Sequence, residues 1–281
     1  MTALTQLDAD LRKIGAAYSG KWTYALTDLT SGGHIGFAEE DVMPTASLIK
    51  VPVLVTLYQA VHDGRLSLDD RIRYEPEHDV QGSGVLMRLS HGVEMTVRDA
   101  AVLMIIISDN VATNMCIDLV GLDAINAQMR SYGLEQTSLF RRLGDRGGGL
   151  DARKMSVSTG REMARLLELI ARHEAVSAEA SEDILRIMRR QDYRNELSRL
   201  LPWNELNVLP DHRDNWVAEK GGAFLNGIRA SGAVFHGTRG AFVMAAFCEG
   251  GTAGGGTGRE AEGNVLIGEL GHTAWQRLLA S

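Results

Sequence analysis

The sequence predicts an α+β protein, because strand-like segments lie at both ends of the chain and helix-like segments fill its middle. Alternating polar and apolar residues occur near residues 21–37 and return between residues 216 and 249. Strands supplied by the two ends of a chain can meet in one antiparallel sheet. We therefore expect an antiparallel sheet with the two terminal helices on one face and a helical lobe inserted between its strands.

The first 37 residues change from a helical to a strand-like pattern. Apolar residues recur at helical spacing at Leu4, Leu7, Leu11 and Ile14, and then at every second position at Trp22, Tyr24 and Leu26. A turn signal follows at Ser31-Gly32-Gly33. This order predicts a helix, a strand, a hairpin turn and a second strand.

The middle of the chain has an almost purely helical pattern. The predicted helices are residues 47–62, 97–107, 111–120, 122–132, 160–172 and 179–190. Thr96 and Thr159 are expected to cap helix N-termini, the second with Glu162 completing a capping box. Gly121 and Gly133 are expected to end helices, because glycine tolerates the left-handed backbone found there.

The last part of the chain returns to strands and closes with a helix. Predicted strands are Trp216–Lys220, Ile228–His236 and Ala241–Glu249, and the helix is Asn264–Ala280. We expect residues 1–46 and 200–281 to form one α/β lobe and residues 47–199 to form an all-helical lobe. The active site is then expected in the cleft between the two lobes.

Composition narrows the range of partners. With 281 residues and 44% hydrophobic content, the chain can bury one large core or two closely packed lobes. Its formal net charge is −7 and it has no run of lysine or arginine. A surface of this kind does not attract nucleic acid or an anionic membrane, so we expect neither partner.

The N-terminus carries acidic residues and no apolar core of a secretory signal. The longest comparable apolar run, Ala100–Ile107, is too short to cross a membrane. We expect the chain as given to be cytoplasmic or a processed form of a secreted protein. The eight histidines and two cysteines show no metal-like spacing, so we expect no metal and no cofactor.

Three short motifs point to serine acyl transfer. Ser47 and Lys50 lie three residues apart at the head of an apolar helical run, and this spacing puts both on one helix face. A serine hydroxyl is a poor nucleophile at neutral pH, so it needs a neighbouring base and donors for the oxyanion that it creates. Ser108-Asp109-Asn110 and Lys220-Gly221-Gly222 follow later in the chain.

The order of these motifs resembles the S-x-x-K, S-D-N and K-T-G pattern of class A β-lactamases and penicillin-binding proteins. The resemblance extends from the first strand pair to the last helix. It implies a β-lactamase or transpeptidase-like fold, a serine nucleophile and an acyl-enzyme intermediate. The substrate that it implies is a small amide or ester, with β-lactam hydrolysis as the activity of the family.

Because Ser47 lies at a helix start, its backbone N–H can donate a hydrogen bond to an oxyanion. If Lys50 is buried, its amine loses its preference for the charged form and could accept the serine proton. For the family, whether this lysine or a water held by a glutamate is the acylation base is disputed. The resemblance implies further roles. Ser108 relays a proton to the leaving group with help from Lys220, and Asn110 holds Lys50 and the substrate amide.

The strand that follows Lys220 is expected to bind substrate. Its edge at Gly222 can pair with an extended amide, and the resemblance makes the backbone N–H of Ala223 the second oxyanion donor. The resemblance also makes Arg229, nine residues after Lys220, the candidate anchor for a substrate carboxylate. Asp109 is expected to cap the next helix rather than to act on substrate.

The chain departs from the family pattern in two places. Gly221 stands where the family has a hydroxyl residue, which removes one hydrogen bond to a substrate carboxylate. The segment between Gly133 and Ser158 lacks the Glu-x-x-Leu-Asn signature whose glutamate activates the deacylating water in class A enzymes. Asp145 and Asp151 are the nearest carboxylates; each is either a substitute base or a loop aspartate paired with the adjacent arginines.

These departures leave three functions open. The first is an enzyme that hydrolyses β-lactams. The second is an esterase, amidase or D-alanyl peptidase that acts on another acyl substrate, and the third is a sensor that is acylated by β-lactams without turnover.

Overall fold

A five-stranded antiparallel sheet lies at the centre of the computed structural model, which describes residues 2–145, 151–202, 214–251 and 260–280. The strands follow the order β2-β1-β10-β9-β8. They are β1 (Lys21–Asp28), β2 (His34–Phe37), β8 (Trp216–Ala223), β9 (Arg229–Gly237) and β10 (Gly240–Glu249). Because β1 pairs with β10 along its full length, strands from the two ends of the chain meet in one sheet, as predicted.

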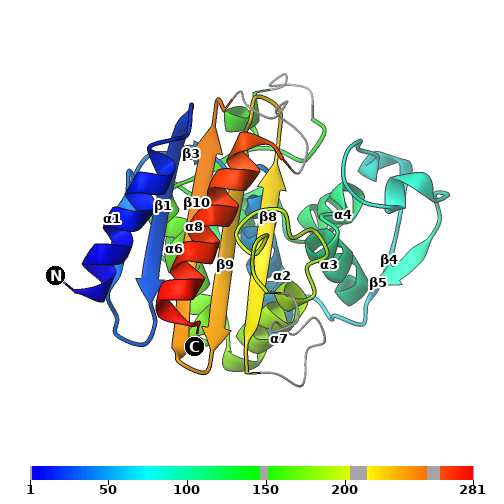
Figure 1. Ribbon diagram of the computed structural model, residues 1–281. Coiled ribbons are helices and arrows are strands. Elements are labelled where there is room, and N and C mark those ends of the chain that lie inside the picture. The colour runs from blue at the N-terminus through cyan, green and yellow to red at the C-terminus, as the bar shows by residue number, and fades with distance from the viewer. Residues whose placement is uncertain (1, 146–150, 203–213, 252–259, 281) are drawn as a thin grey trace.

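Helices cover both faces of this sheet (Figure 1). α1 (Ala3–Gly15) and α8 (Glu262–Leu278) pack against each other on one face, where Leu11, Phe235 and Trp275 belong to one buried cluster. α6 (Gly160–Ala171) lies on the opposite face against β1, β9 and β10. The predicted α+β fold, with both terminal helices on one face of an antiparallel sheet, is confirmed.

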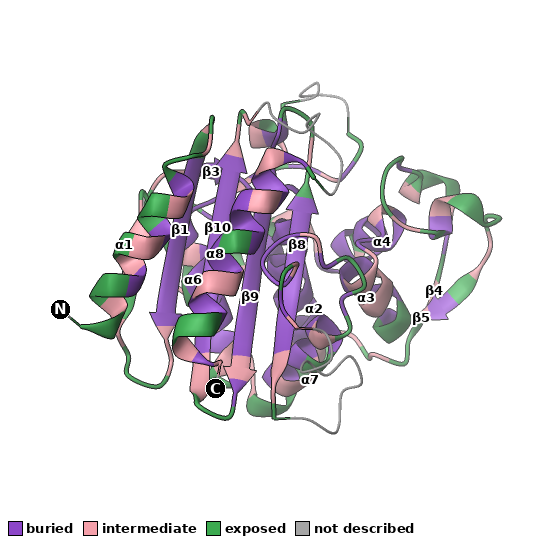
Figure 2. Ribbon diagram, viewed as in Figure 1, coloured by how far each residue is buried: buried purple, intermediate pink, exposed green. Residues whose placement is uncertain are grey.

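The central strands are buried over most of their length because both of their faces are covered (Figure 2). In β1, Tyr24 and Leu26 belong to the cluster beneath the terminal helices, whereas Ala25 belongs to the cluster shared with the central helices. Successive side chains of a strand point to opposite faces, so the alternation visible in the sequence marks one of two buried faces.

The central helices occur where their periodicity predicts them. They are α2 (Lys50–His62), α3 (Val97–Ile106), α4 (Asn110–Val120), α5 (Leu122–Ser131) and α7 (Ala178–Arg189). Thr96 caps α3 through a capping box with Asp99, and Thr159 caps α6. The side chain of Glu162 does not complete a box with Thr159, since it accepts hydrogen bonds from Gln136 and Thr137 instead.

Short strands also occur within the region predicted to be helical. β4 (Arg71–Arg73) pairs with β5 (Glu94–Thr96) in a two-stranded ribbon. A second small sheet consists of β3 (Met43–Pro44), β7 (Ser156–Ser158) and β6 (Ser138–Leu139). Strands of two or three residues contain too few positions for a period to be visible in the sequence.

The predicted division into lobes at residues 46 and 199 stays a prediction. α6 lies inside the proposed helical lobe in sequence and yet packs on the sheet. Within the described ranges, no helix combines the length and the apolar character needed to cross a membrane. Among those same residues, no cluster of three histidine, cysteine, aspartate or glutamate side chains is arranged to hold a metal ion.

Candidate active site

Ser47 lies in a tight turn between β3 and α2. A 3₁₀ turn (Ala46–Ile49) leads directly into α2. Ala46 adopts a left-handed backbone with φ of 44°, a conformation that costs a non-glycine residue about 1–3 kcal/mol. The turn leaves Ser47 half-buried and lining a cleft. A strained backbone that presents a hydroxyl to a cleft is a feature of functional sites.

Strand β8 runs directly against this turn. A Cβ atom added to Gly222 would lie 2.5 Å from the backbone nitrogen of Ser47 and 2.9 Å from that of Leu48. Only glycine allows the backbone to approach so closely. Ala223, the next residue of β8, lines the same cleft as Ser47. The glycine of the Lys-Gly-Gly motif therefore brings the strand edge to the serine.

Lys50 is completely buried beneath the cleft. Its Nζ donates to the carbonyl oxygen of Ser108 at 2.7 Å, to Ser108 Oγ at 3.0 Å and to Asn110 Oδ1 at 2.8 Å. Burial and then the nearby charge of Lys220 lower the pKa of Lys50 well below its usual range, while Asp109 acts in the opposite direction. The amine of Lys50 therefore loses its proton at a lower pH than the amine of an ordinary lysine.

The Ser-Asp-Asn motif forms the junction between α3 and α4. Ser108 has a left-handed backbone with φ of 55° and is buried with its hydroxyl oxygen toward Lys50. Asn110 opens α4 and donates from Nδ2 to the carbonyl oxygen of Gln81 at 3.0 Å. The motif thus connects Lys50 with the loop on the far side of the cleft.

Asp109 caps α4, as predicted. One carboxylate oxygen accepts from the backbone nitrogen of Ala112 at 3.0 Å. The other accepts from the backbone nitrogens of Val85 at 2.6 Å and Leu86 at 2.9 Å. A single carboxylate therefore fixes both the start of α4 and the loop that forms one wall of the cleft.

Lys220 is the second buried lysine of the site. Its Nζ donates to the carbonyl oxygen of Gly221 at 2.6 Å. Burial lowers the pKa of Lys220, while Glu196 and Glu219 act in the opposite direction. The carboxylates beside Lys220 favour its charged form, whereas the surroundings of Lys50 favour the neutral amine.

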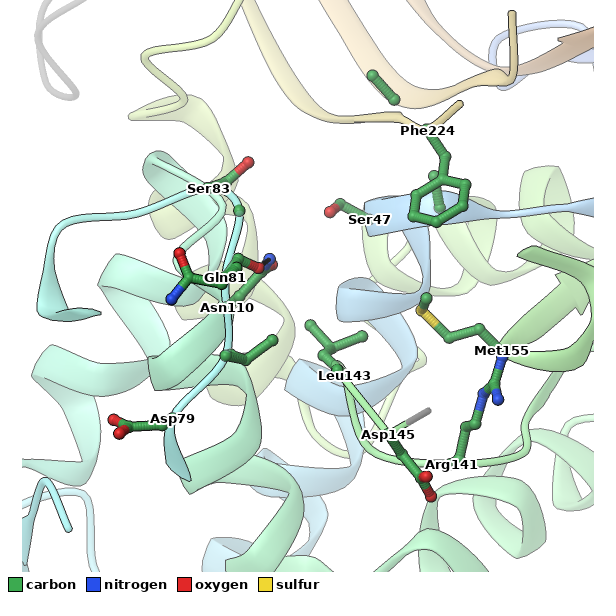
Figure 3. Close-up of a pocket in the computed structure, with 15 residues that line it drawn as sticks. Ser47, Asp79, Gln81, Ser83, Asn110, Arg141, Leu143, Asp145, Met155 and Phe224 are labelled. Carbon is green, nitrogen blue, oxygen red and sulfur yellow. Dashed lines mark hydrogen bonds between the residues drawn. The ribbon is translucent and has the colours of Figure 1, made fainter. Parts of the chain in front are cut away.

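The cleft encloses about 800 Å³ and is open enough for a small molecule. Figure 3 shows Ser47 and Phe224 on one side, with Gln81, Ser83 and Asn110 across from them. The lower part is lined by Arg141, Leu143, Gly144, Asp145 and Met155. Gln81, Ser83 and Phe224 carry no motif that would identify them in the sequence.

The loop after β6 contributes one carboxylate to the cleft. Asp145 lines it beside Gly144, which presents no side chain. Asp151 instead caps the 3₁₀ turn Ala152–Lys154 and lines a separate cavity of about 240 Å³. Residues 146–150 of the same loop lie outside the described part of the chain.

Arg229 is not among the residues that line the cleft. Its guanidinium is buried and donates to Asn264 Oδ1 at 2.8 Å and to the carbonyl oxygen of Ile228 at 2.7 Å. A weaker bond joins it to the carbonyl oxygen of Phe224. The structure therefore brings together Ser47, Lys50, Ser108, Asn110, Lys220, Gly222 and Ala223, whereas the buried Arg229 lies outside the lining of the cleft.

Glu196 belongs to none of the motifs in the sequence. This side chain is buried, and its Oε2 lies 2.3 Å from where a Cβ atom of residue 221 would be. Burial, followed by the charge of Glu219, raises the pKa of Glu196, while Lys220 and Arg229 lower it. The sequence carries only an indirect signal for Glu196. Gly221 lies inside a strand rather than at a turn, and glycine in a strand often marks the close approach of another group.

Comparisons with known proteins show which family and fold this chain resembles. A family model described as the β-lactamase enzyme family matches residues 6–278. Beta-lactamase L2 of Stenotrophomonas maltophilia is 30% identical over 125 residues, which are 44% of this chain and 41% of that protein. The match thus spans less than half of the length of this curated relative.

Solved structures match almost the whole chain. The crystal structure of a β-lactamase from Sphaerobacter thermophilus DSM 20745 has 26% identity and a TM-score of 0.84, over 98% of this chain and 96% of that chain. PBP-A has 26% identity and a TM-score of 0.82, over 97% and 96%. A PBP-A mutant in an acyl-enzyme complex with penicillin G matches with 26% identity and a TM-score of 0.81, over 97% of this chain and 96% of that chain.

Proposed function

The chain belongs to the β-lactamase enzyme family, and we propose that it is a serine hydrolase in which Ser47 forms an acyl-enzyme with a small amide or ester. β-Lactam hydrolysis is the activity that the family implies. The observation that carries the proposal is Lys50, a buried amine bonded to Ser108 and Asn110 beneath a cleft that Ser47 lines.

In the acylation step, Ser47 Oγ attacks the acyl carbonyl carbon and a C–O bond forms. The neutral amine of Lys50 accepts the hydroxyl proton, a role that its lowered pKa supports. Among the described residues no hydrogen bond joins Ser47 Oγ to Lys50 Nζ, and such bonds commonly tighten when substrate binds.

The carbonyl oxygen becomes an oxyanion and needs donors. The backbone N–H of Ser47 at the start of its helical segment and that of Ala223 on the strand edge are the two proposed donors. The close approach of Gly222 to Ser47 supports this pairing, since it holds strand and turn together. Removing one such donor costs about 10²–10³ in kcat in another serine enzyme.

The intermediate collapses when the bond to the leaving group breaks. Ser108 Oγ gives its proton to the departing nitrogen or oxygen and recovers one from the Lys50 ammonium, with which it is hydrogen-bonded. The charge of Lys220 acts on the same region, and Asn110 positions the substrate amide. Water then attacks the acyl carbon, releases the carboxylic acid and restores the hydroxyl of Ser47.

Deacylation is where this chain is expected to differ from a class A β-lactamase. The loop after β6 places Gly144 and Asp145 in the cleft. Gly144 has no side chain that could act as a base for the deacylating water, and Asp145 is exposed. This favours turnover of small esters or amides, which leave the cleft open to water, over turnover of β-lactams. A non-turnover β-lactam sensor is the limiting case of slow release.

The test compares two serines of the same cleft. Ser47→Ala should lower turnover of nitrophenyl esters and nitrocefin by about 10³-fold or more, because loss of a nucleophile is rarely compensated. Ser83→Ala is the matched control, since Ser83 lines the cleft and has no assigned chemical role. Activity of the Ser47 variant within tenfold of wild type would reject the proposal.

A further inference from the structure

Position 221 and Arg229, which are expected to hold a substrate carboxylate, lie on one face of the sheet. Side chains alternate along β8, so Glu219 and Gly221 point to one face and Lys220 to the other. Gly221 is paired with Ser231 and Ala223 with Arg229, which places Arg229 on the face of Gly221. The missing hydroxyl and Arg229 therefore belong to the same face of the sheet, and the charge of Arg229 reaches Glu196 there.

That place already contains a carboxylate. A Cβ atom on residue 221 would lie 2.3 Å from Glu196 Oε2, 2.8 Å from its Cδ and 3.3 Å from its Oε1. The backbone of Gly221 is not in the left-handed region, so its conformation alone does not require glycine. A side chain at position 221 would therefore displace the carboxylate of Glu196 from where it lies.

The carboxylates at this place already have buried cationic partners. Glu196 and Glu219 lie near Lys220 and Arg229, and the charge of the buried Arg194 also acts on Glu219. Glu219 is hydrogen-bonded to Ser231 Oγ at 2.7 Å and to Ser198. A substrate carboxylate brought to this place would lie beside the buried carboxylates of Glu196 and Glu219, and repulsion between like charges is costly in a buried setting.

We propose that Glu196 is a specificity-determining residue: its carboxylate takes the place of a substrate carboxylate, so the enzyme selects acyl substrates without an anionic group beside the scissile bond. This inference rests on the proposed function and names its substrate class. The ligands favoured are neutral esters and amides. Penicillins carry a carboxylate next to the lactam nitrogen and are correspondingly disfavoured.

The test uses two aryl phenylacetylglycinates that differ in one leaving-group substituent, a carboxylate in the first and a carboxamide in the second. Wild type should be acylated faster by the carboxamide ester, by about fivefold or more in acylation efficiency at about pH 8, where most Glu196 side chains are ionised. Glu196→Gln, which keeps the shape and removes the charge, should shift this ratio by about fivefold or more toward the carboxylate ester at the same pH.

A matched control removes a different carboxylate. Glu260→Gln deletes an exposed partner of Arg199 and should leave the ratio unchanged. An unchanged ratio in Glu196→Gln, or a wild type that prefers the carboxylate ester, would overturn the inference. If neither ester is hydrolysed in a Ser47-dependent manner, the proposed function fails as well, so the two failures are distinguishable.

A second pair of variants tests the contact itself. Gly221→Thr should lower the urea midpoint of unfolding, because its Cβ would collide with Glu196. Glu196→Ala combined with Gly221→Thr should recover most of this loss and favour the carboxylate ester. Additive destabilisation in the double variant would show that the two residues do not compete for the same space.

Discussion

Two buried lysines share the site at the scale of single residues, and their surroundings assign them different tasks. Lys50 Nζ is bonded to neutral oxygens of Ser108 and Asn110, whereas Lys220 lies near Glu196 and Glu219. Burial lowers the pKa of both amines. The first environment suits a neutral base, and in the second the carboxylates favour a charged lysine near neutral pH.

The same substitution at the two positions should therefore have unequal effects. Lys50→Arg should reduce acylation of Ser47 by about 10²–10⁴-fold, because a guanidinium cannot become a neutral base at working pH. Lys220→Arg should keep measurable activity, because it retains the charge. Stopped-flow acylation of the two variants is the measurement, and equal damage from both would refute this division of roles.

Glu196 should make substrate choice depend on pH. Burial and Glu219 raise its pKa, while Lys220 and Arg229 oppose the shift. Below the raised pKa, Glu196 is protonated and no longer repels a substrate carboxylate. The preference for the carboxamide ester should grow as pH rises through that pKa, over a range of about pH 5 to 9. Glu196→Gln should remove this rise below about pH 8, the pKa to which burial lowers Lys220, and a flat profile in wild type would argue against the role of Glu196.

At the scale of elements, Asp109 joins α4 to the loop across the cleft. Asp109→Ala should lower the free energy of unfolding by about 2–4 kcal/mol, because it removes a helix cap and leaves backbone N–H groups of Val85 and Leu86 without their acceptor. Turnover should fall with it, since the loop forms a wall of the site. Urea denaturation and steady-state kinetics measure the two effects.

Ser177→Ala is the control, because Ser177 caps α7 away from the cleft. It should cost about 1 kcal/mol and leave turnover unchanged. If Asp109→Ala destabilises the protein no more than this control, the carboxylate of Asp109 does not stabilise the loop at Val85 and Leu86.

The loop after β6 decides how fast the acyl-enzyme is released. Asp145→Asn and Asp151→Asn should each change deacylation by less than about tenfold, well short of the roughly 10²–10⁴ of a general base. Asp145 is exposed, and Asp151 is engaged in capping a 3₁₀ turn. The lifetime of the penicillin adduct by mass spectrometry tests this; a collapse of turnover in either variant would identify the base.

At the scale of the whole molecule, the sequence predicts the fold better than it predicts the site. Pairing of strands from both chain ends follows from long periodic segments, and the fold is confirmed. The position of α6 on the sheet could not be predicted, because its amphipathic pattern does not say which surface it covers. The environments of Glu196 and Arg229 depend on partners far away in sequence, such as Asn264, and no local pattern encodes them.

If Ser47 carries the acyl group, the residue modified during turnover can be identified. The protein is quenched during turnover of the carboxamide ester, and the adduct is located by peptide mass mapping. We predict one acyl group per chain on the peptide that contains Ser47, with no adduct in Ser47→Ala and an undiminished adduct in Ser83→Ala. An acyl group on another residue, or one that persists in Ser47→Ala, would show that Ser47 is not the nucleophile.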